Sequence, residues 1–284
     1  MEQIKKRVLT AGAVVGYGRF LLQEERAPAT MEKYLREVRE FAAWLGGRPA
    51  DKAAAVAWKE RLLSLALSPA TVNGKLSALN SLFRFLGWEE CRIKLLKVQR
   101  RAFRDPEREL TREEYLRLLA AARETGQERL ELLMEAVCST GIRVSEVPCL
   151  TVEAARSGRA VIRLKGKIRT VLLPGKLCRK LLKYAQRQKN ASGEIFLTRG
   201  GKRLSRKQIW REMKALCARA GVEPSKVFPH NLRHLFAVTF YRVCRDVVKL
   251  ADLLGHSSVE TTRIYLLTTG DEHAKYLDRL RLIS

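Results

Sequence analysis

Apolar residues at helical spacing are the feature that most limits the fold of this 284-residue chain. Leu35, Val38 and Phe41 fall on one helix face, and the same three-and-four spacing returns along most of the chain. Over residues 159–174 apolar and polar residues alternate instead, and Gly166 lies between two such runs. This pattern predicts a β-hairpin. The sequence therefore predicts a mainly helical protein with one small antiparallel sheet in its second half.

The first hundred residues carry repeated helix-start signals. Pro28 and Pro69 each occupy the first position of a predicted helix, where a missing backbone N–H does no harm. Each of these helices carries an apolar stripe that ends in Leu-Gly, and a further helix is expected between them over residues 53–67. Together these segments predict a small, all-helical domain at residues 1–96.

The charge of the chain is strongly unbalanced. Lys and Arg number 55 against 30 Asp and Glu, which gives a net charge of +25. Such an excess predicts a polyanionic partner, with nucleic acid as the first candidate. An anionic membrane surface is the second candidate, and it would require a basic amphipathic helix or a lipid site. The C-terminal Leu-Ile-Ser offers none and the chain has no uninterrupted apolar stretch of membrane-spanning length, so no membrane partner is expected.

The helical pattern lapses over residues 97–109, where basic residues and Pro106 replace the apolar stripe. This composition predicts a linker, which could follow a phosphate backbone or be an ordinary solvated loop. Thr111 and Glu114 then form a capping-box pattern, so a second domain is expected at residues 110–284. The linker residues that we assign to nucleic-acid contact are Lys97, Arg100 and Arg101.

A second basic cluster surrounds a predicted helix start at Ser205. Basic side chains at such a position suit contacts to nucleic-acid phosphates, although a merely solvated helix face would have the same composition. The total charge favours the phosphate contact. The residues that we assign to it are Lys202, Arg203, Arg206, Lys207 and Arg211.

The six cysteines lie far apart and none forms a C-x-x-C pair, which argues against a zinc site and predicts reduced thiols in a cytoplasmic protein. The four histidines are scattered, carboxylates show no two-metal spacing, and no glycine-rich phosphate loop is present. We therefore expect no metal and no other cofactor.

The stretch from Pro229 to Tyr265 gathers residue types that can handle a phosphate. His230 and Arg233 are three residues apart and so share a helix face. Gly255 follows an apolar run, where a helix would end. A lone His–Arg pair is usually a surface pair and a lone Tyr usually belongs to a core, but their conjunction favours a site that binds an oxyanion and carries a nucleophile.

Four sequence blocks together resemble the tyrosine recombinase family, which includes lambda-type integrases and Xer recombinases. In the family's order they are R-x-S-E from Arg143, a hairpin lysine at Lys165, H-x-x-R from His230, and G-H-x-x-x-x-T-T-x-x-Y ending at Tyr265. The resemblance covers the catalytic half and, more loosely, the first hundred residues. It implies a SAM-like core-binding domain and a catalytic domain of the DNA breaking–rejoining type.

The resemblance also implies a role for each motif residue. Tyr265 would be the nucleophile that forms a 3′-phosphotyrosine with DNA. Arg143 and Arg233 would neutralise the pentavalent phosphorane, since a guanidinium presents a fixed fork to two phosphate oxygens. His256 would add a hydrogen bond to the same oxygens. Glu146 would orient the catalytic side chains without contacting the DNA itself. The alternative is that it forms an ordinary surface salt bridge.

Proton transfer would involve two further residues. Lys165 at the hairpin tip would protonate the leaving 5′-oxygen, and His230 would take or share a proton during attack. Lys167 is an alternative to Lys165, because the hairpin register cannot be derived from the sequence. Tyr241 and Tyr276 are alternative nucleophiles by residue type alone, but the first fits a helix core pattern and the second lies beyond the motif.

As a member of this family the protein would act on double-stranded DNA at a specific recombination site. It would work as a homo-tetramer across two sites, giving integration, excision or resolution through a Holliday junction, with accessory DNA-binding proteins as further partners. Two alternatives stay open. The same residues serve a type IB topoisomerase, which relaxes DNA, and a catalytically inactive DNA-binding regulator would keep the same basic surface.

Overall fold

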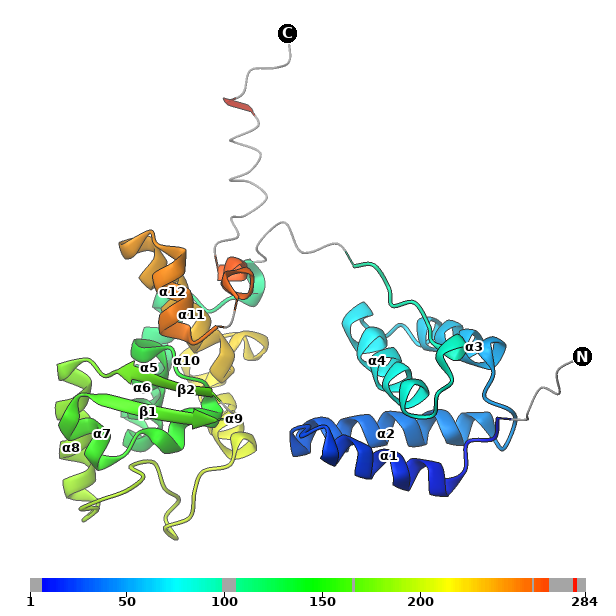
Figure 1. Cartoon of the computed structure of the whole chain (residues 1–284). Helices are drawn as coiled ribbons and strands as arrows, with labels where there is room; N and C mark the ends of the chain where they lie inside the picture. The colour runs from blue at the N-terminus through cyan, green and yellow to red at the C-terminus, as the bar shows by residue number, and fades with distance from the viewer. Residues whose placement is uncertain (1–6, 99–105, 165–166, 257, 266–277, 280–284) are drawn as a thin grey trace, which may run out of the picture. The chain divides into compact units, whose positions relative to one another are not determined.

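The computed structural model describes residues 7–98, 106–164, 167–256, 258–265 and 278–279. The chain divides into two compact units, Met1–Arg100 and Arg101–Ser284 (Figure 1). Both units are mainly helical, and the described strands form one two-stranded antiparallel sheet. The predicted fold class is thus confirmed. None of the described helices is both long and apolar enough to cross a membrane.

The first unit packs its helices around aromatic side chains. Ser68 accepts a hydrogen bond from the backbone N–H of Thr71, which fixes the start of α4 as its sequence predicts. Phe41 meets Trp58 and Phe83 edge-on, with ring centroids 5.7 and 6.2 Å apart, so α2, α3 and α4 share one core. Its elements are α1 (Ala11–Gln23), α2 (Pro28–Leu45), α3 (Lys52–Ser64), α4 (Pro69–Phe85) and the 3-10 helix Glu89–Cys91.

The second unit is built around α6, which contacts α5, α8, α9 and α11. Thr111 and Glu114 make both bonds of the predicted capping box at the start of α5. The α-helices of this unit are α5 (Arg112–Glu124), α6 (Glu128–Thr140), α7 (Val152–Ser157), α8 (Gly175–Arg187), α9 (Arg206–Ala215), α10 (Cys217–Ala220), α11 (Pro229–Cys244), α12 (Val247–Leu254) and α13 (Val259–Thr262). Its 3-10 helices are Pro106–Arg108, Val144–Cys149, Pro224–Lys226 and Arg263–Tyr265.

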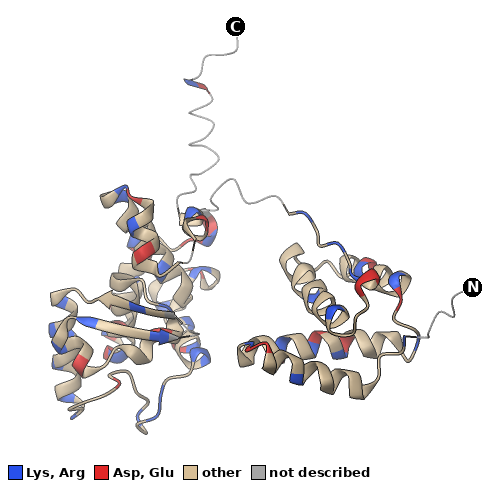
Figure 2. Ribbon diagram, viewed as in Figure 1, with Lys and Arg blue, Asp and Glu red and all other residues tan. Residues whose placement is uncertain are grey.

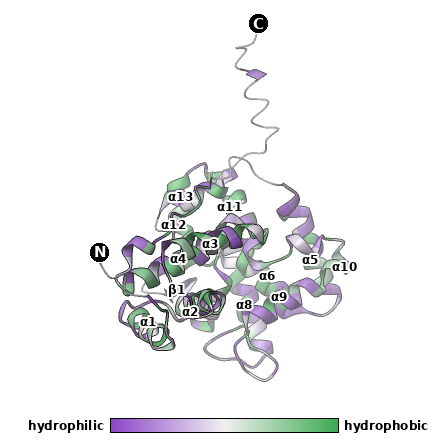
Figure 3. Ribbon diagram, turned by 90° about the vertical axis from the view of Figure 1, so that its right-hand side faces the viewer, coloured by the Kyte–Doolittle hydropathy of each residue, from purple (hydrophilic) through white to green (hydrophobic). Residues whose placement is uncertain are grey.

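The sheet consists of β1 (Arg159–Leu164) and β2 (Lys167–Leu172). Their register runs from Arg159 opposite Leu172 to Leu164 opposite Lys167. Ile162 and Val171 are buried, whereas Val161 and Ile168 are exposed, so the hairpin turns one face to the core, as the alternation predicts. Figure 3 shows hydrophobic and hydrophilic residues mixed along the helices, as expected of amphipathic elements that bury one face.

Candidate active site

Arg233 is the most deeply placed cation of the site. It lies one turn into α11 and is only 2% exposed. Its guanidinium donates to the carbonyls of Gly141 and Leu254, the latter at 2.8 Å. Burial, aided by the charge of Arg143, lowers the pKa of Arg233 to about 10, which still leaves it positive at neutral pH. The fold thus holds a fixed positive charge at the start of α11.

Gly141 makes the approach of α6 to α11 possible. It ends α6 with φ +64°, and a Cβ there would lie 2.4 Å from Cδ1 of Phe236 on α11. A side chain would therefore have to displace the Phe236 ring or the helix that carries it. The glycine both admits the close contact and presents its carbonyl to Arg233.

Arg143 is anchored by Glu146. The backbone N–H of Arg143 donates to Oε2 of Glu146 at 2.8 Å, and Nη1 donates to Oε1 at 3.0 Å. Glu146 is 2% exposed, so it is not a surface salt bridge. Burial would raise the pKa of its carboxyl, but the Arg143 amide and the charges of Arg169 and Arg143 outweigh burial and lower that pKa. The Arg143 side chain remains 39% exposed, which leaves it accessible to a ligand.

His256 lies just after the helix stop at Gly255 and contacts two buried side chains. Its Nε2 is 3.0 Å from Nη2 of Arg233, and its Nδ1 is 2.8 Å from Oγ1 of Thr262. A guanidinium can only donate, so Nε2 accepts and Nδ1 carries the proton. Burial and then the charge of Arg233 are the largest causes that lower the pKa of His256 to about 4. The ring is therefore neutral at pH 7.

Tyr265 is held between two histidine rings. It ends the 3-10 helix that follows α13, whose start is capped by Ser258. Its side chain is 3% exposed and packs on α11 and α12. The ring of His256 stacks on it with centroids 6.1 Å apart, and His234 meets it edge-on at 5.1 Å. These contacts fix the plane of the phenol beside Arg233.

His230 occupies the first turn of α11, on the same side as Arg233. Its side chain is exposed by area, yet enough protein atoms surround the ring for burial to be the largest cause of its lowered pKa. The charges of Arg233 and Arg143 lower that pKa further. A neutral imidazole at this position can accept a proton.

Sequence reasoning missed three residues that the structure brings to this group. Arg169 pairs with Glu146, Thr262 with His256, and the ring of His234 with Tyr265. Thr262 had a signal, since it is the second threonine of the T-T block, and His234 is the residue directly after the H-x-x-R block. Arg169 had none beyond its place in the predicted hairpin.

The hairpin lysines and the two alternative tyrosines are the remaining catalytic candidates, and the structure describes only some of them. Lys165 and Tyr276 lie outside the described residues. Lys167 pairs with Leu164 at the end of the strand register. Tyr241 packs against the apolar cluster of α11 and α12, as a core residue does.

The predicted nucleic-acid contacts fall into two groups. In the linker, Lys97 is exposed, and Arg100 and Arg101 lie outside the described residues. Around the start of α9 all five assigned side chains are exposed, and blue residues mark this region in Figure 2. Arg203 differs from its neighbours because its Nε donates to Glu194 at 2.9 Å. The exposed residues on α9 and in the segment before it are Lys202, Arg203, Arg206, Lys207 and Arg211.

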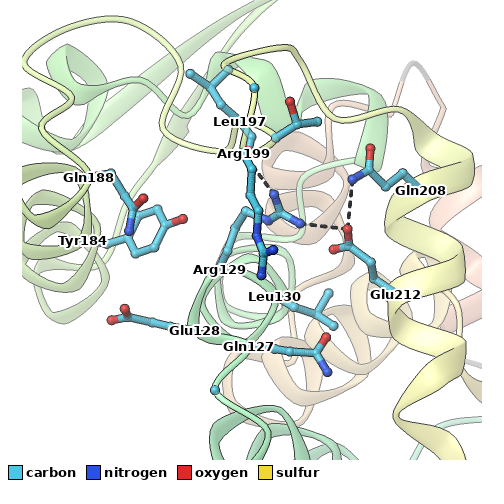
Figure 4. Close-up of a pocket in the computed structure, with 13 residues that line it drawn as sticks. Gln127, Glu128, Arg129, Leu130, Tyr184, Gln188, Leu197, Arg199, Gln208 and Glu212 are labelled. Atoms are coloured by element: carbon cyan, nitrogen blue, oxygen red, sulfur yellow. Dashed lines mark hydrogen bonds and ion pairs between the residues drawn. The ribbon is translucent and has the colours of Figure 1, made fainter.

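A pocket of about 730 Å³ lies away from this group, between α6, α8, α9 and the segment before α9 (Figure 4). Arg129 crosses it to donate to the carbonyl of Leu197 at 2.8 Å and to Glu212 at 2.7 Å. None of the catalytic candidates lines it. Within the described ranges, no group of three or more His, Cys, Asp or Glu could hold a metal ion.

Comparison with known proteins decides the family. Residues 108–270 match the model of the phage integrase family, and residues 14–90 match the phage integrase N-terminal SAM-like domain. This chain belongs to the phage integrase family of tyrosine recombinases. Tyrosine recombinases are DNA strand-transferring enzymes.

A curated relative supports the family assignment, and two solved structures of other proteins share the fold. Tyrosine recombinase XerA of Thermococcus kodakarensis is 30% identical over 273 residues, which cover 93% of either protein. The lambda integrase tetramer bound to a Holliday junction shares the fold with a TM-score of 0.73 and 18% identity, covering 91% of this chain and 78% of that one. The XerH recombinase bound to its difH substrate shares the fold with a TM-score of 0.68 and 18% identity, covering 97% of this chain and 90% of that one.

Proposed function

We propose that this protein is a site-specific DNA recombinase that cleaves and rejoins strands through a 3′-phosphotyrosine at Tyr265. The observation that carries the proposal is the position of this phenol, which is clamped by His256 and His234 beside the buried cation Arg233. A tyrosine that serves only a core does not need a charged guanidinium next to it. A tyrosine that attacks a phosphate needs such a positive charge, because negative charge develops on the phosphate oxygens.

In the proposed reaction the Tyr265 oxygen attacks the scissile phosphorus while the bond to the 5′-oxygen breaks. His230 accepts or shares the phenol proton, and the hairpin lysine, Lys165, gives a proton to the leaving 5′-oxygen. Arg143 and Arg233 stabilise the charge that develops on the non-bridging oxygens. Attack of a 5′-hydroxyl on the phosphotyrosine reverses the step, so no external energy source is required.

The protonation state of His256 adds a condition to this mechanism. In the structure Nε2 accepts from Arg233 and cannot donate at the same time. For His256 to donate to a phosphate oxygen, as the family resemblance implies, its proton must move from Nδ1 to Nε2. Contact of Arg233 with the phosphate would free Nε2 for that change.

We further propose the domain organisation that the sequence indicates. Residues 1–96 form the core-binding domain, residues 97–109 a basic linker, and residues 110–284 the catalytic domain. The partner is double-stranded DNA at a specific site, with a homo-tetramer across two sites and a Holliday junction between the two strand exchanges. The lambda integrase tetramer bound to a Holliday junction and XerH bound to its difH substrate support these partners by analogy. Such an enzyme works in the cytoplasm, with the chromosomal DNA.

Covalent trapping tests the proposal. The protein is mixed, without divalent metal and with EDTA, with nicked duplex DNA that carries a site recovered by binding selection. After denaturation, wild type should give a protein–DNA band, Tyr265→Phe should give none, and the matched control Tyr241→Phe should behave as wild type. Absence of an adduct on DNA that wild type binds tightly would favour the binding-only alternative. Relaxation of plasmids that lack the site would favour the topoisomerase.

A further inference from the structure

Arg169 on β2 contacts the segments that carry two catalytic candidates. Its Nη2 donates to Oε2 of Glu146 at 2.6 Å, and its Nη1 donates to the carbonyl of Leu253 at 2.6 Å. Glu146 anchors Arg143, and Leu253 lies in the last turn of α12, shortly before His256. One guanidinium therefore joins the segment that carries Arg143 to the segment that carries His256.

The geometry of this bridge depends on the planar fork of arginine. Two terminal nitrogens point at two acceptors on different segments, which a compact ammonium cannot reproduce. The side chain is 14% exposed, and its Nε is buried with no hydrogen-bond partner among the described residues. A buried donor without a partner is unfavourable, so the two terminal bonds, rather than solvation, hold Arg169 in place.

The backbone beside His256 is shaped around this side chain. Gly255 ends α12 with φ +62°, and a Cβ at this position would lie 2.3 Å from Cδ and 2.7 Å from Nε of Arg169. Any residue larger than glycine would have to displace Arg169 or the end of α12. The turn that carries His256 and the guanidinium that holds Glu146 are thus in direct contact.

We propose that Arg169 is a positioning residue that fixes the spacing between Arg143 and His256 across the phosphate-binding pocket. This inference rests on the proposed function, because it places the scissile phosphate between these two side chains. Both terminal nitrogens of Arg169 donate to protein oxygens, so its contacts support a positioning role. A displacement of about 1 Å in a catalytic group can reduce a rate on the order of 10²-fold.

The first test compares Arg169→Lys with Arg163→Lys. Arg163 lies on β1 of the same hairpin, is exposed, and sits opposite Ile168 on the outer face, so the control makes the same substitution where no bridge exists. Single-turnover adduct formation on nicked site DNA gives the saturated rate and the DNA concentration at half-maximal rate. Arg169→Lys should lower the saturated rate on the order of 10²-fold and leave that concentration unchanged within about twofold. Arg163→Lys should change neither.

A second set of variants covers the case in which Arg169→Lys does not stay folded at the assay temperature, as its melting curve would show. Gly255→Ala keeps the guanidinium but pushes against it, so it should also lower the saturated rate. Gly221→Ala is the matched control, because Gly221 also has a positive φ (+58°) but nothing lies within 4 Å of an added Cβ. It should leave the saturated rate unchanged, and a folded Gly255→Ala that reacts at the rate of Gly221→Ala would overturn the proposal.

The outcomes separate this inference from the proposed function. If wild type forms no adduct on DNA that it binds, the recombinase mechanism fails. If wild type forms the adduct and Arg169→Lys forms it at the same saturated rate, the mechanism stands and the positioning role of Arg169 is wrong. A loss that appears only in the DNA concentration required would make Arg169 a DNA-binding residue, which also overturns the proposal.

Discussion

Arg233 and His256 share a hydrogen bond whose direction is set by the arginine. The guanidinium donates across 3.0 Å to Nε2, so the imidazole proton resides on Nδ1 and points at Thr262. The site therefore combines the permanent charge of Arg233 with a neutral histidine, which accepts from Arg233 and stacks on the Tyr265 ring. This arrangement lets a phosphate approach positive charge without requiring a protonated imidazole.

The first prediction concerns stability at acid pH. The folded protein holds the pKa of His256 at about 4, against 6.5 in an exposed histidine. Between these values the unfolded chain binds a proton that the folded chain does not, so stability falls as pH decreases from about 6.5 to about 4. His230 acts in the same direction. Melting temperatures measured against pH should show this decline, and His256→Gln should flatten it; an unchanged slope would contradict the assignment.

The second prediction concerns Thr262, which is fully buried and accepts from Nδ1 of His256. Thr262→Val removes the acceptor at nearly constant volume and leaves a buried donor unpaired, which should cost about 1–3 kcal/mol of unfolding free energy. Adduct formation should slow as well, because the ring loses its fixed tautomer. Thr262→Ser should retain both properties, and Thr261→Val, at the exposed neighbouring position, is the matched control in urea unfolding and trapping assays.

The third prediction concerns the Glu146 carboxylate, which is shared by Arg143 and Arg169. Glu146→Gln leaves two guanidiniums around a neutral amide and should destabilise the protein by about 3–5 kcal/mol, as for other broken buried ion pairs. Glu128→Gln breaks the exposed pair with Arg187 and should cost less than about 1 kcal/mol. Urea unfolding at pH 7 measures both, and equal losses would show that Glu146 does not hold the site together.

The fourth prediction concerns DNA binding by the α9 cluster. Arg206 is exposed at the first position of α9, whereas Arg203 is already engaged by Glu194. If these residues neutralise phosphates, Arg206→Ala should reduce the slope of log affinity against log salt by about 1 unit. Arg203→Ala should reduce it less, because its guanidinium must first leave Glu194. Binding titrations on duplex DNA at several salt concentrations test the difference.

Much of the fold was accessible to sequence reasoning because its signals are local. Ser68 and Thr111 cap helices through bonds to residues three positions ahead. The hairpin alternation and the glycine after α12 act over similarly short distances. The blocks around Arg143, His230 and Tyr265 also keep their order along the chain, so a family pattern could be recognised without coordinates.

Contacts between segments that are distant in sequence became known only from the tertiary structure. Arg169 meets Glu146 across 23 positions, and Arg233 meets the carbonyl of Gly141 across 92. The register that places Lys167 opposite Leu164 is likewise set by pairing between the two strands. The tautomer of His256 follows from which donor reaches its ring. Sequence determines which side chains are available, but hydrogen-bond direction, burial and pKa depend on the three-dimensional neighbours that packing assigns to each of them.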